Sequence, residues 1–413
     1  MRAHVVGAGL AGLSAAMCLA EAGYAISLSE ASPQAGGRCR SYHDPKLGLT
    51  IDNGNHLLLS GNARAQAYLK RIGAADRLTG PGEAAFPFVD LRDGTRWTVR
   101  PNDGPLPWWT ASPSRRVPGT RVADYLPLAR LALAPGDGTL SDRLRTAGAL
   151  WERLLEPFFV AALNTPAAGA SARLAGAIVS GTLAKGGRAC RPLVAHPTLS
   201  AAFVDPAVAW LERHGATIRT GRRLRSIAFD GGRATALTFP DGSDAVAPGE
   251  PVILATPAWV AAELVPGLVV PDWHHAIVNA HFLLASPADT SLVTGVVGGT
   301  AEWIFAFPDR LSATVSAADA LCDEDREAVA RRIWGDIAAV HRLPSTLPPW
   351  QIVRERRATY AATPEQDRRR PPARTAWRNL FLGGDWTQTG LPATIEGSIL
   401  SGETAAAYAH HAR

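Results

Sequence analysis

The chain has 413 residues, 46% of them hydrophobic and 19% charged, which is the composition of a soluble globular protein with one large core or two fused ones. Its 42 basic and 37 acidic residues give a formal charge of +5, and the basic residues are scattered, which argues against a nucleic-acid partner. The four cysteines have no metal-ligand spacing, so we expect no metal site and a reducing, cytoplasmic compartment.

The first thirty residues predict a strand over residues 4–6, a tight turn, a helix over 13–22 and a second strand over 25–29. The turn reads Gly7-Ala8-Gly9-Leu10-Ala11-Gly12, a spacing that binds a dinucleotide when it follows a strand and opens a helix. This glycine spacing argues against a signal peptide over the apolar run 5–20.

Each residue of this turn has an expected role. Gly7 permits the sharp turn, Gly9 lets the backbone approach a pyrophosphate, and Gly12 allows the helix to pack closely on the strand. The free amides of Leu10 and Ala11, together with the positive end of the helix dipole, would bind the phosphates. The turn therefore predicts a dinucleotide cofactor.

Glu30 ends the second strand, where its carboxylate would accept hydrogen bonds from ribose hydroxyls and repel a 2′-phosphate, which favours FAD or NAD over NADP. The following string, from Glu30-Ala31-Ser32 to Gly36-Gly37-Arg38, is one that NAD dehydrogenases usually lack. It resembles the amine oxidase and phytoene desaturase superfamily of flavoproteins. The resemblance implies that Ala31, Gly37 and Arg38 lie along FAD.

Asp52-Asn53-Gly54-Asn55-His56 matches the next element of that superfamily, which lies near the flavin ring. The resemblance places Gly54 and Asn55 against the cofactor. His56 has two interpretations, a catalytic residue or a capped loop histidine, and the sequence alone leaves both open.

The middle of the chain predicts further helices and strands. We expect helices over 64–72, 144–162 and 325–340, and strands over 216–219, 224–229, 234–239 and 251–255, the last of which ends at Pro257. Residues 211–216 followed by Leu224 resemble the superfamily's strand that contacts adenine, and residues 253–257, with Ala255, resemble the strand that returns to the cofactor domain. The glycine-rich stretch 295–300 is expected to be a turn.

Near the carboxyl end, residues 381–386 predict a strand that ends in a Gly-Gly-Asp turn, and a helix opens at Thr394 and runs through residue 408. The pattern resembles the superfamily's second FAD motif, in which Gly384 and Asp385 would contact the ribityl or phosphate side. Thr394 and Ile395 would direct helix amides at the flavin's pyrimidine edge, where they stabilise negative charge on the reduced ring. Glu396 either contacts the flavin or caps a helix.

Together these elements predict an α/β fold: a Rossmann-like FAD-binding domain of the glutathione-reductase type with an inserted α+β substrate-binding region. The FAD-binding domain is expected to be discontinuous and to comprise residues 1–60, 205–262 and 375–413. Residues 61–204 and 263–374 would form the substrate-binding region, which is also the candidate for contact with a membrane.

Within the superfamily the chain resembles the hydroxysqualene dehydroxylases, long labelled squalene-associated FAD-dependent desaturases. The resemblance rests on residues 51–59, 162–166 with 170–172, 277–279 before His281, 355–360 and 384–396. The sequence departs from the family at Asn55, where glutamine is commoner, and at Gln388. These departures leave the roles of those two side chains open.

The resemblance implies reductive removal of the hydroxyl group of a C30 isoprenoid alcohol, which gives squalene for hopanoid synthesis. A general acid would protonate the allylic hydroxyl, and hydride from reduced FAD would quench the cation. We name His56 first and Glu396 second as the acid. Aromatic faces stabilise such a cation, and the candidates, each of which could equally be a core residue, are Phe158, Phe159, Trp303, Phe305 and Trp386.

A C30 substrate resides in the bilayer, so the enzyme would need an apolar path to it. Residues 105–135 combine Trp108-Trp109, Arg115-Arg116 and an apolar run at 125–131, a composition typical of an interfacial segment. We therefore expect peripheral association with the inner face of the cytoplasmic membrane. The alternative is a lid packed on its own domain.

Three other functions stay open. A phytoene or dehydrosqualene desaturase would run hydride in the opposite direction, and FAD motifs do not separate the two. An amine oxidase often has a lysine near the flavin, but Lys46, Lys70 and Lys185 lie in no matching motif. The third is a non-catalytic FAD-binding scaffold. Because the chain has no second dinucleotide motif, we expect an external reductant that the sequence does not identify.

Overall fold

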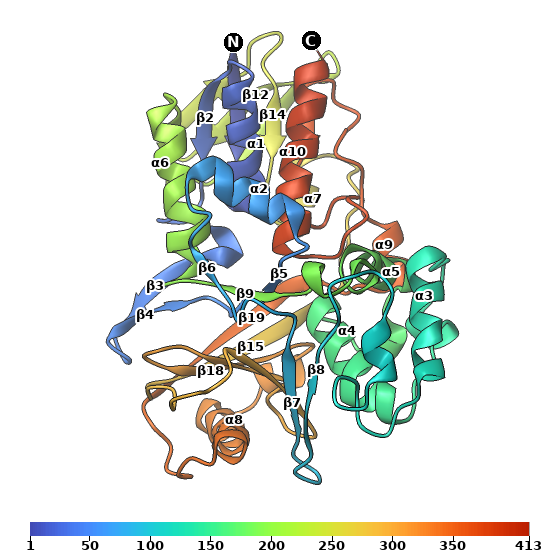
Figure 1. The fold of residues 1–413 in the computed structure, drawn as a ribbon. Coiled ribbons are helices and arrows are strands. Elements are labelled where there is room, and N and C mark those ends of the chain that lie inside the picture. The colour runs from blue at the N-terminus through green and yellow to red at the C-terminus, as the bar shows by residue number, and fades with distance from the viewer. Residues whose placement is uncertain (413) are drawn as a thin grey trace.

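The structure is a computed structural model that describes residues 1–412, and its first part is a parallel sheet of five strands in the order β10-β2-β1-β14-β20. The strands are β10 (Thr217–Arg219), β2 (Ala25–Ser29), β1 (Arg2–Val6), β14 (Val252–Leu254) and β20 (Leu380–Leu382). All five come from residues 1–60, 205–262 and 375–413. Strands from both ends of the chain thus form one sheet, and the two termini lie at the same end of the molecule (Figure 1).

Helices cover one face of this sheet, and a second, smaller sheet covers the other. Helices α1 (Leu10–Glu21), α10 (Ile395–His411), α2 (Ala63–Ile72) and α6 (Asp205–Arg213) share a core with Ile253 of β14. Val252 and Leu254 face the opposite way, toward the antiparallel strands β11 (Ser226–Asp230), β12 (Arg233–Phe239) and β13 (Gly242–Ala245). The all-apolar Val-Ile-Leu sequence of β14 follows from this burial on both faces.

The second part is a mixed sheet of seven strands in the order β19-β15-β18-β17-β16-β7-β8. The strands are β19 (Trp350–Tyr360), β15 (His274–Phe282), β18 (Leu311–Val315), β17 (Trp303–Ala306), β16 (Val293–Val297), β7 (Phe86–Asp90) and β8 (Arg96–Val99). Val278, Ala280 and Phe282 alternate along β15 and pack on α8 (Arg326–His341). Asn279 and His281 point to the other face.

That other face of the seven-stranded sheet faces the cofactor part and a helical lobe (Figure 1). The lobe contains α3 (Leu126–Leu133), α4 (Glu156–Leu163) and α5 (Ala172–Gly181). The remaining α-helices and β-strands are α7 (Ala258–Leu264), α9 (Pro364–Arg368), β3 (Ser41–Asp44), β4 (Leu49–Asp52), β5 (Leu58–Leu59), β6 (Leu78–Thr79) and β9 (Pro192–Ala195). No helix within residues 1–412 is long and apolar enough to cross a membrane.

The α/β fold is as predicted, but three local predictions are wrong. The helix expected from residue 144 begins only at residue 149, because Gly148 has a φ of +90° that no right-handed helix accepts, and its first part is a π-turn, Trp151–Leu155. Residues 211–213 end helix α6 instead of forming a strand. Residues 295–297 belong to β16 instead of a turn.

The contact between α1 and α10 gives a stability prediction. A Cβ on Gly402 would lie 2.1 Å from the Ala11 carbonyl oxygen, and backbone atoms cannot move aside cheaply. We expect Gly402→Ala to lower the free energy of unfolding by about 1–3 kcal/mol in urea denaturation. The matched control is Gly335→Ala in the exposed face of α8, where a Cβ meets nothing within 4 Å, and it should raise stability by up to about 1 kcal/mol. Equal effects of the two substitutions would contradict the close helix packing.

Candidate cofactor and active site

The glycine turn between β1 and α1 has the geometry of a dinucleotide cradle. Gly7 has a φ of +103°, and a Cβ there would lie 2.3 Å from the Ala255 oxygen. A Cβ on Gly12 would lie 1.8 Å from the Gly7 oxygen, whereas a Cβ on Gly9 meets nothing within 4 Å. Packing therefore requires two of the glycines, and the third borders open space, as a pyrophosphate needs.

The amino end of α1 faces the same open space. Gly9 is the N-cap, and the first turn of α1 has no acidic residue. Glu30 is 9% exposed and accepts hydrogen bonds from the amides of Ala8 at 2.7 Å and Ser32 at 2.8 Å. The helix dipole and the fixed carboxylate fit the phosphate and ribose of FAD.

The Gly-Gly-Arg loop connects this cradle to the carboxyl end of the chain. Gly36 and Gly37 both have positive φ, and the Gly36 amide donates to the Ala8 oxygen at 2.8 Å. Arg38 Nη2 lies 2.6 Å from Asp385 Oδ2, and its Nη1 donates to the Ala358 oxygen at 2.5 Å. The structure thus brings together Arg38 and Asp385, which are 347 positions apart.

The carboxyl-terminal motif surrounds the same site. Gly384 has a φ of +145°, and its amide donates to the Ser401 hydroxyl at 2.8 Å. The Thr394 hydroxyl caps α10 by accepting from the Gly397 amide at 3.1 Å, which leaves the Ile395 amide at the helix end. Ala255 follows β14, and its amide donates to the Val6 oxygen of β1 at 2.8 Å. This hydrogen bond holds Ala255 beside the glycine turn. These residues fit FAD; their contacts with it stay predictions.

Two residues predicted near the cofactor make no contact that identifies a cofactor role. Leu224 is buried between β10 and β11, 6% exposed, in the core that covers the outer face of the parallel sheet. Ala31 is exposed, immediately after Glu30. The structure shows neither in a hydrogen bond that would fix its role.

The structure favours the helix-capping alternative for Glu396, and its role as an acid stays a prediction. Both of its carboxylate oxygens accept backbone amides at the start of α2, from Arg64 and Ala65, each at 2.9 Å. This is a helix-capping geometry that satisfies two amides left free at the helix end. Glu396 therefore holds α2 against α10 and caps a neighbouring helix instead of its own.

The loop that carries His56 lies across the seven-stranded sheet. Asn53 Nδ2 donates to Glu355 Oε2 of β19 at 3.3 Å, and the Asn55 amide donates to Asn279 Oδ1 of β15 at 3.1 Å. The imidazole of His56 is half-buried, and burial followed by the positive charge of Arg38 lowers its pKa to about 4. His56 is thus a neutral imidazole at neutral pH.

Asn279 and Thr314, which sequence reasoning did not assign to the site, fix this loop. The Thr314 hydroxyl donates to Asn279 Oδ1 at 2.7 Å and accepts from Asn55 Nδ2 at 3.2 Å. A Cβ on Gly54 would lie 3.1 Å from Asn279 Nδ2, so glycine lets the loop approach the sheet. Asn279 lies in one of the segments that carry the family resemblance. This was the one feature of the sequence that could have indicated its role in the site.

The predicted aromatic residues belong to one buried cluster. Trp303 and Phe305 alternate along β17 on the face that carries Thr314 and Ser312, and Phe159 of α4 is fully buried in the same cluster. Phe158 packs edge-on to Phe159, with ring centroids 5.2 Å apart. Trp386 belongs to this cluster too, and its indole donates to the Thr256 oxygen at 2.9 Å. Their contact with substrate stays a prediction.

Asn164, another residue of the resemblance segments, has a structural role. It ends α4 with a φ of +46°, and its Oδ1 accepts from the Ala317 amide at 2.7 Å. Its Nδ2 donates to the His275 oxygen at 3.1 Å and to the Thr359 hydroxyl at 3.0 Å. One amide side chain therefore ties α4 to the ends of β15, β18 and β19.

Glu302 is a titratable residue that no sequence motif indicated. It precedes Trp303 at the start of β17, and its Oε2 accepts from the Ser316 amide at 2.8 Å. Burial raises the pKa of Glu302 to about 7, although the Ser316 hydrogen bonds oppose the shift. This carboxyl is therefore partly protonated at neutral pH, one position before an aromatic residue of the predicted substrate wall.

Comparison with known proteins agrees with this geometry. The family model of flavin-containing amine oxidoreductases matches residues 10–410. Proteins named hydroxysqualene dehydroxylase from Zymomonas mobilis, Rhodopseudomonas palustris and Sinorhizobium fredii are each 51% identical to the chain, over 98% of its length and 97% of theirs.

Two solved structures share the fold at low identity. A putative protoporphyrinogen oxidase from Exiguobacterium superposes with a TM-score of 0.72 at 18% identity and covers 100% of this chain and 99% of its own. Cyclohexylamine oxidase from Brevibacterium oxydans gives a TM-score of 0.74 at 14% identity, over 99% of this chain and 98% of its own. Both likenesses show the fold alone.

The open space at Gly9 gives a cofactor prediction. Gly9 has a φ of −73°, which alanine adopts freely, so Gly9→Ala should leave the unfolding temperature of the FAD-free protein unchanged. Its methyl group would occupy the space for the pyrophosphate and weaken FAD binding by about tenfold or more, measured by fluorescence titration. Unchanged FAD affinity would contradict the placement of the cofactor at this turn.

Glu302 gives a prediction for stability. Its pKa in the folded protein is about 7, against 4.5 as the ordinary value, so folding favours the protonated form. The contribution of Glu302 to the free energy of unfolding is fully present below pH 4.5. It falls by roughly 3 kcal/mol as pH rises toward 7. Glu302→Gln should therefore gain stability relative to wild type by that amount across this pH range, in urea denaturation, whereas the exposed Glu263→Gln control should not. A pH-independent difference would mean that Glu302 is ionised in the folded protein.

Proposed function

Because the chain belongs to the hydroxysqualene dehydroxylase family within the flavin-containing amine oxidoreductases, we propose that it removes the hydroxyl group of hydroxysqualene to give squalene. The observation that carries the proposal is the 51% identity over 98% of the chain, which includes both ends that form the FAD cradle and the sheet beneath His56. The chain is an FAD-dependent oxidoreductase.

The reaction needs two electrons and one proton from outside the substrate. The C–O bond breaks, a proton joins the departing hydroxyl to give water, and a hydride forms the new C–H bond. Reduced FAD supplies the hydride, and an external reductant must restore it. The chain's own residues bind FAD, exclude water from the cation and deliver the proton.

The aromatic cluster supports this chemistry. Phe159, Trp303 and Phe305 are 0%, 6% and 3% exposed, so their surroundings exclude water. Ring faces attract a cation through their quadrupole without offering a nucleophile that would trap it. We infer that the C30 chain lies along this cluster, between α4 and the seven-stranded sheet.

Two groups compete for the role of proton donor, and the pH dependence of the rate separates them. An acid must be protonated, so a donor with the pKa of His56 would lose activity from about pH 4 upward, and one with the pKa of Glu302 from about pH 7 upward. Single-turnover rates between pH 5 and 9 test this. If Glu302 is the donor, Glu302→Gln lowers the rate by about 100-fold or more and removes the decline near pH 7, while His56→Gln retains it. A rate that falls throughout this pH range, and that His56→Gln lowers while Glu302→Gln does not, would assign the proton to His56.

An anaerobic assay of flavin reoxidation and squalene formation tests the proposed activity. Reduced enzyme mixed with hydroxysqualene should be reoxidised, with one squalene formed per flavin. If reduced enzyme leaves the alcohol untouched while oxidised enzyme is bleached by dehydrosqualene or phytoene, the chain is a desaturase. If FAD binds but no polyprenyl substrate reacts in either direction, the scaffold interpretation holds.

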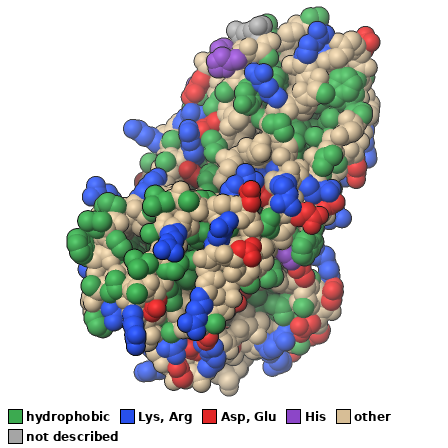
Figure 2. Space-filling model, turned by 90° about the vertical axis from the view of Figure 1, so that its right-hand side faces the viewer, with side chains coloured by type: hydrophobic (Ala, Val, Ile, Leu, Met, Phe, Trp, Pro, Cys, Tyr) green, Lys and Arg blue, Asp and Glu red, His purple; other side chains and the backbone are tan. Residues whose placement is uncertain are grey.

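We further propose that residues 106–133 associate with the inner face of the cytoplasmic membrane. Most of the large hydrophobic side chains exposed within residues 1–412 lie here: Leu106, Trp108, Val122, Leu126 and Leu133, at 59%, 70%, 46%, 63% and 87% exposure. Figure 2 looks onto the side of the molecule that carries α3 and shows hydrophobic side chains gathered there, with basic ones nearby. Exposed apolar and basic residues together suit a lipid interface.

Vesicle binding tests the membrane proposal. Leu126→Ser with Leu133→Ser should reduce co-sedimentation with phosphatidylglycerol vesicles by about tenfold or more, because each leucine contributes buried apolar area. Both side chains are exposed, so the unfolding temperature should not change. Val269→Ser, at a position that is 59% exposed outside this segment, is the control. If the double variant binds vesicles as wild type does, the segment is a lid.

A further inference from the structure

A hollow of about 520 Å³ opens at the β7–β8 edge of the seven-stranded sheet, away from the cofactor loop. Trp303 pairs with Gly295, and Gly295 pairs with Phe88, so these residues share the face that carries the cofactor loop. Thr294 and Arg96 stand at the alternate positions and face the side of α8. None of the predicted FAD or substrate residues lines this hollow.

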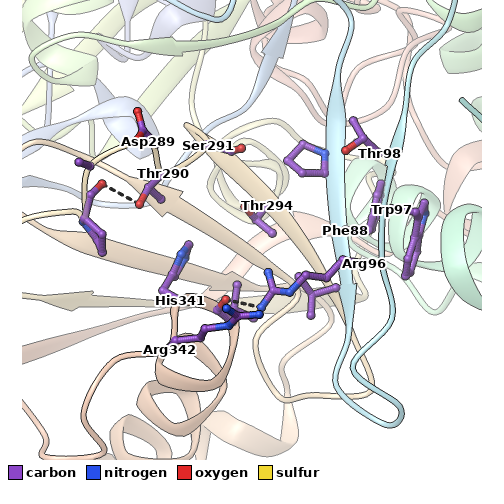
Figure 3. Close-up of a pocket in the computed structure, with 15 residues that line it drawn as sticks. Phe88, Arg96, Trp97, Thr98, Asp289, Thr290, Ser291, Thr294, His341 and Arg342 are labelled. Atoms are coloured by element: carbon purple, nitrogen blue, oxygen red, sulfur yellow. Dashed lines mark hydrogen bonds between the residues drawn. The ribbon is translucent and has the colours of Figure 1, made fainter. Parts of the chain in front are cut away.

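Basic side chains line this hollow. Figure 3 shows the side chains of Arg96, from β8, and Arg342, after α8, pointing toward each other, with His341 beside them. Arg96 donates to the Val340 oxygen at 2.5 Å, but neither arginine pairs with a carboxylate within residues 1–412. The single acidic residue of the lining, Asp289, is exposed and forms no ion pair in that part of the chain.

The backbone and one buried nitrogen atom mark this hollow as a formed site. Arg342 and Asp289, with φ of +56° and +65°, are two of the four non-glycine residues with positive φ within the described residues. Such strain concentrates at binding sites. Nε2 of His341, in the lining, is buried and has no hydrogen-bond partner within residues 1–412.

We propose that this hollow binds the phosphate or diphosphate group of a small phosphate ester. Two guanidinium groups without carboxylates match phosphate oxygens, and the hydroxyls of Thr98 and Thr294 add further donors. The volume is that of an ordinary small-ligand site. Because the sheet separates the hollow from the cofactor loop, the ligand is neither the hydroxyl substrate nor the hydride donor, and the inference does not rest on the proposed function.

Calorimetric titration of the FAD-loaded full chain with inorganic pyrophosphate tests the site. Arg342→Gly removes one guanidinium and relieves the positive φ, so it should not lower the unfolding temperature. It should weaken pyrophosphate binding by about tenfold or more, since a charged hydrogen-bonding partner is lost. Arg100→Ala, which removes the same charge immediately after β8 but outside the lining, should leave the affinity within about twofold.

Vesicles that contain phosphatidic acid, tested with the same variants, separate the two sources of this chemistry. Soluble pyrophosphate binding that depends on Arg342 identifies a free phosphate ester as the ligand. Vesicle binding that depends on Arg342 identifies a lipid headgroup. If neither probe binds, or if Arg342→Gly and Arg100→Ala weaken binding equally, the site does not exist as proposed.

Discussion

The contact between the first and last helices is the constraint on which the cofactor site depends. Gly402 of α10 lies so close to the Ala11 carbonyl of α1 that no side chain fits between them. This contact fixes the amino ends of both helices at one edge of the parallel sheet, where the Gly9 turn, the Glu30 carboxylate and the Arg38–Asp385 pair also lie. Two helix dipoles from opposite ends of the sequence therefore act on one bound dinucleotide.

The seven-stranded sheet fixes the geometry of the active site, as the contact between α1 and α10 fixes that of the cofactor site. Its strands hold the loop at residues 53–56 through Glu355, Asn279 and Thr314, one strand after another. The same face continues into Trp303 and Phe305, so the polar support of the loop and the apolar wall belong to one rigid surface. The opposite face packs on α8 and keeps that surface in place.

Local sequence patterns predicted the features that depend on residues close together in the chain. The roles of Gly7, Gly9 and Gly12 follow from φ and close packing, and the boundaries of most helices and strands agree within a few residues. What the sequence could not predict depends on contacts between distant segments. The two bonds from Glu396 to α2, the support of Asn55 by Asn279 and the burial of Glu302 each join residues that only the folded chain brings together. The irregular segment before residue 149 was missed because Leu144, Arg145 and Ala147 suit a helix while Gly148, with its positive φ, does not.

The most direct test of the central claim is the transfer of a labelled hydride. FAD-free protein would be loaded with reduced 5-deaza-FAD that carries two deuterium atoms at C5, a position that does not exchange with water, and mixed anaerobically with hydroxysqualene. The account predicts squalene with one deuterium at the carbon that carried the hydroxyl group, in an amount equal to the bound cofactor. Squalene without deuterium, or no squalene while the protein holds the reduced cofactor and the alcohol, would contradict it.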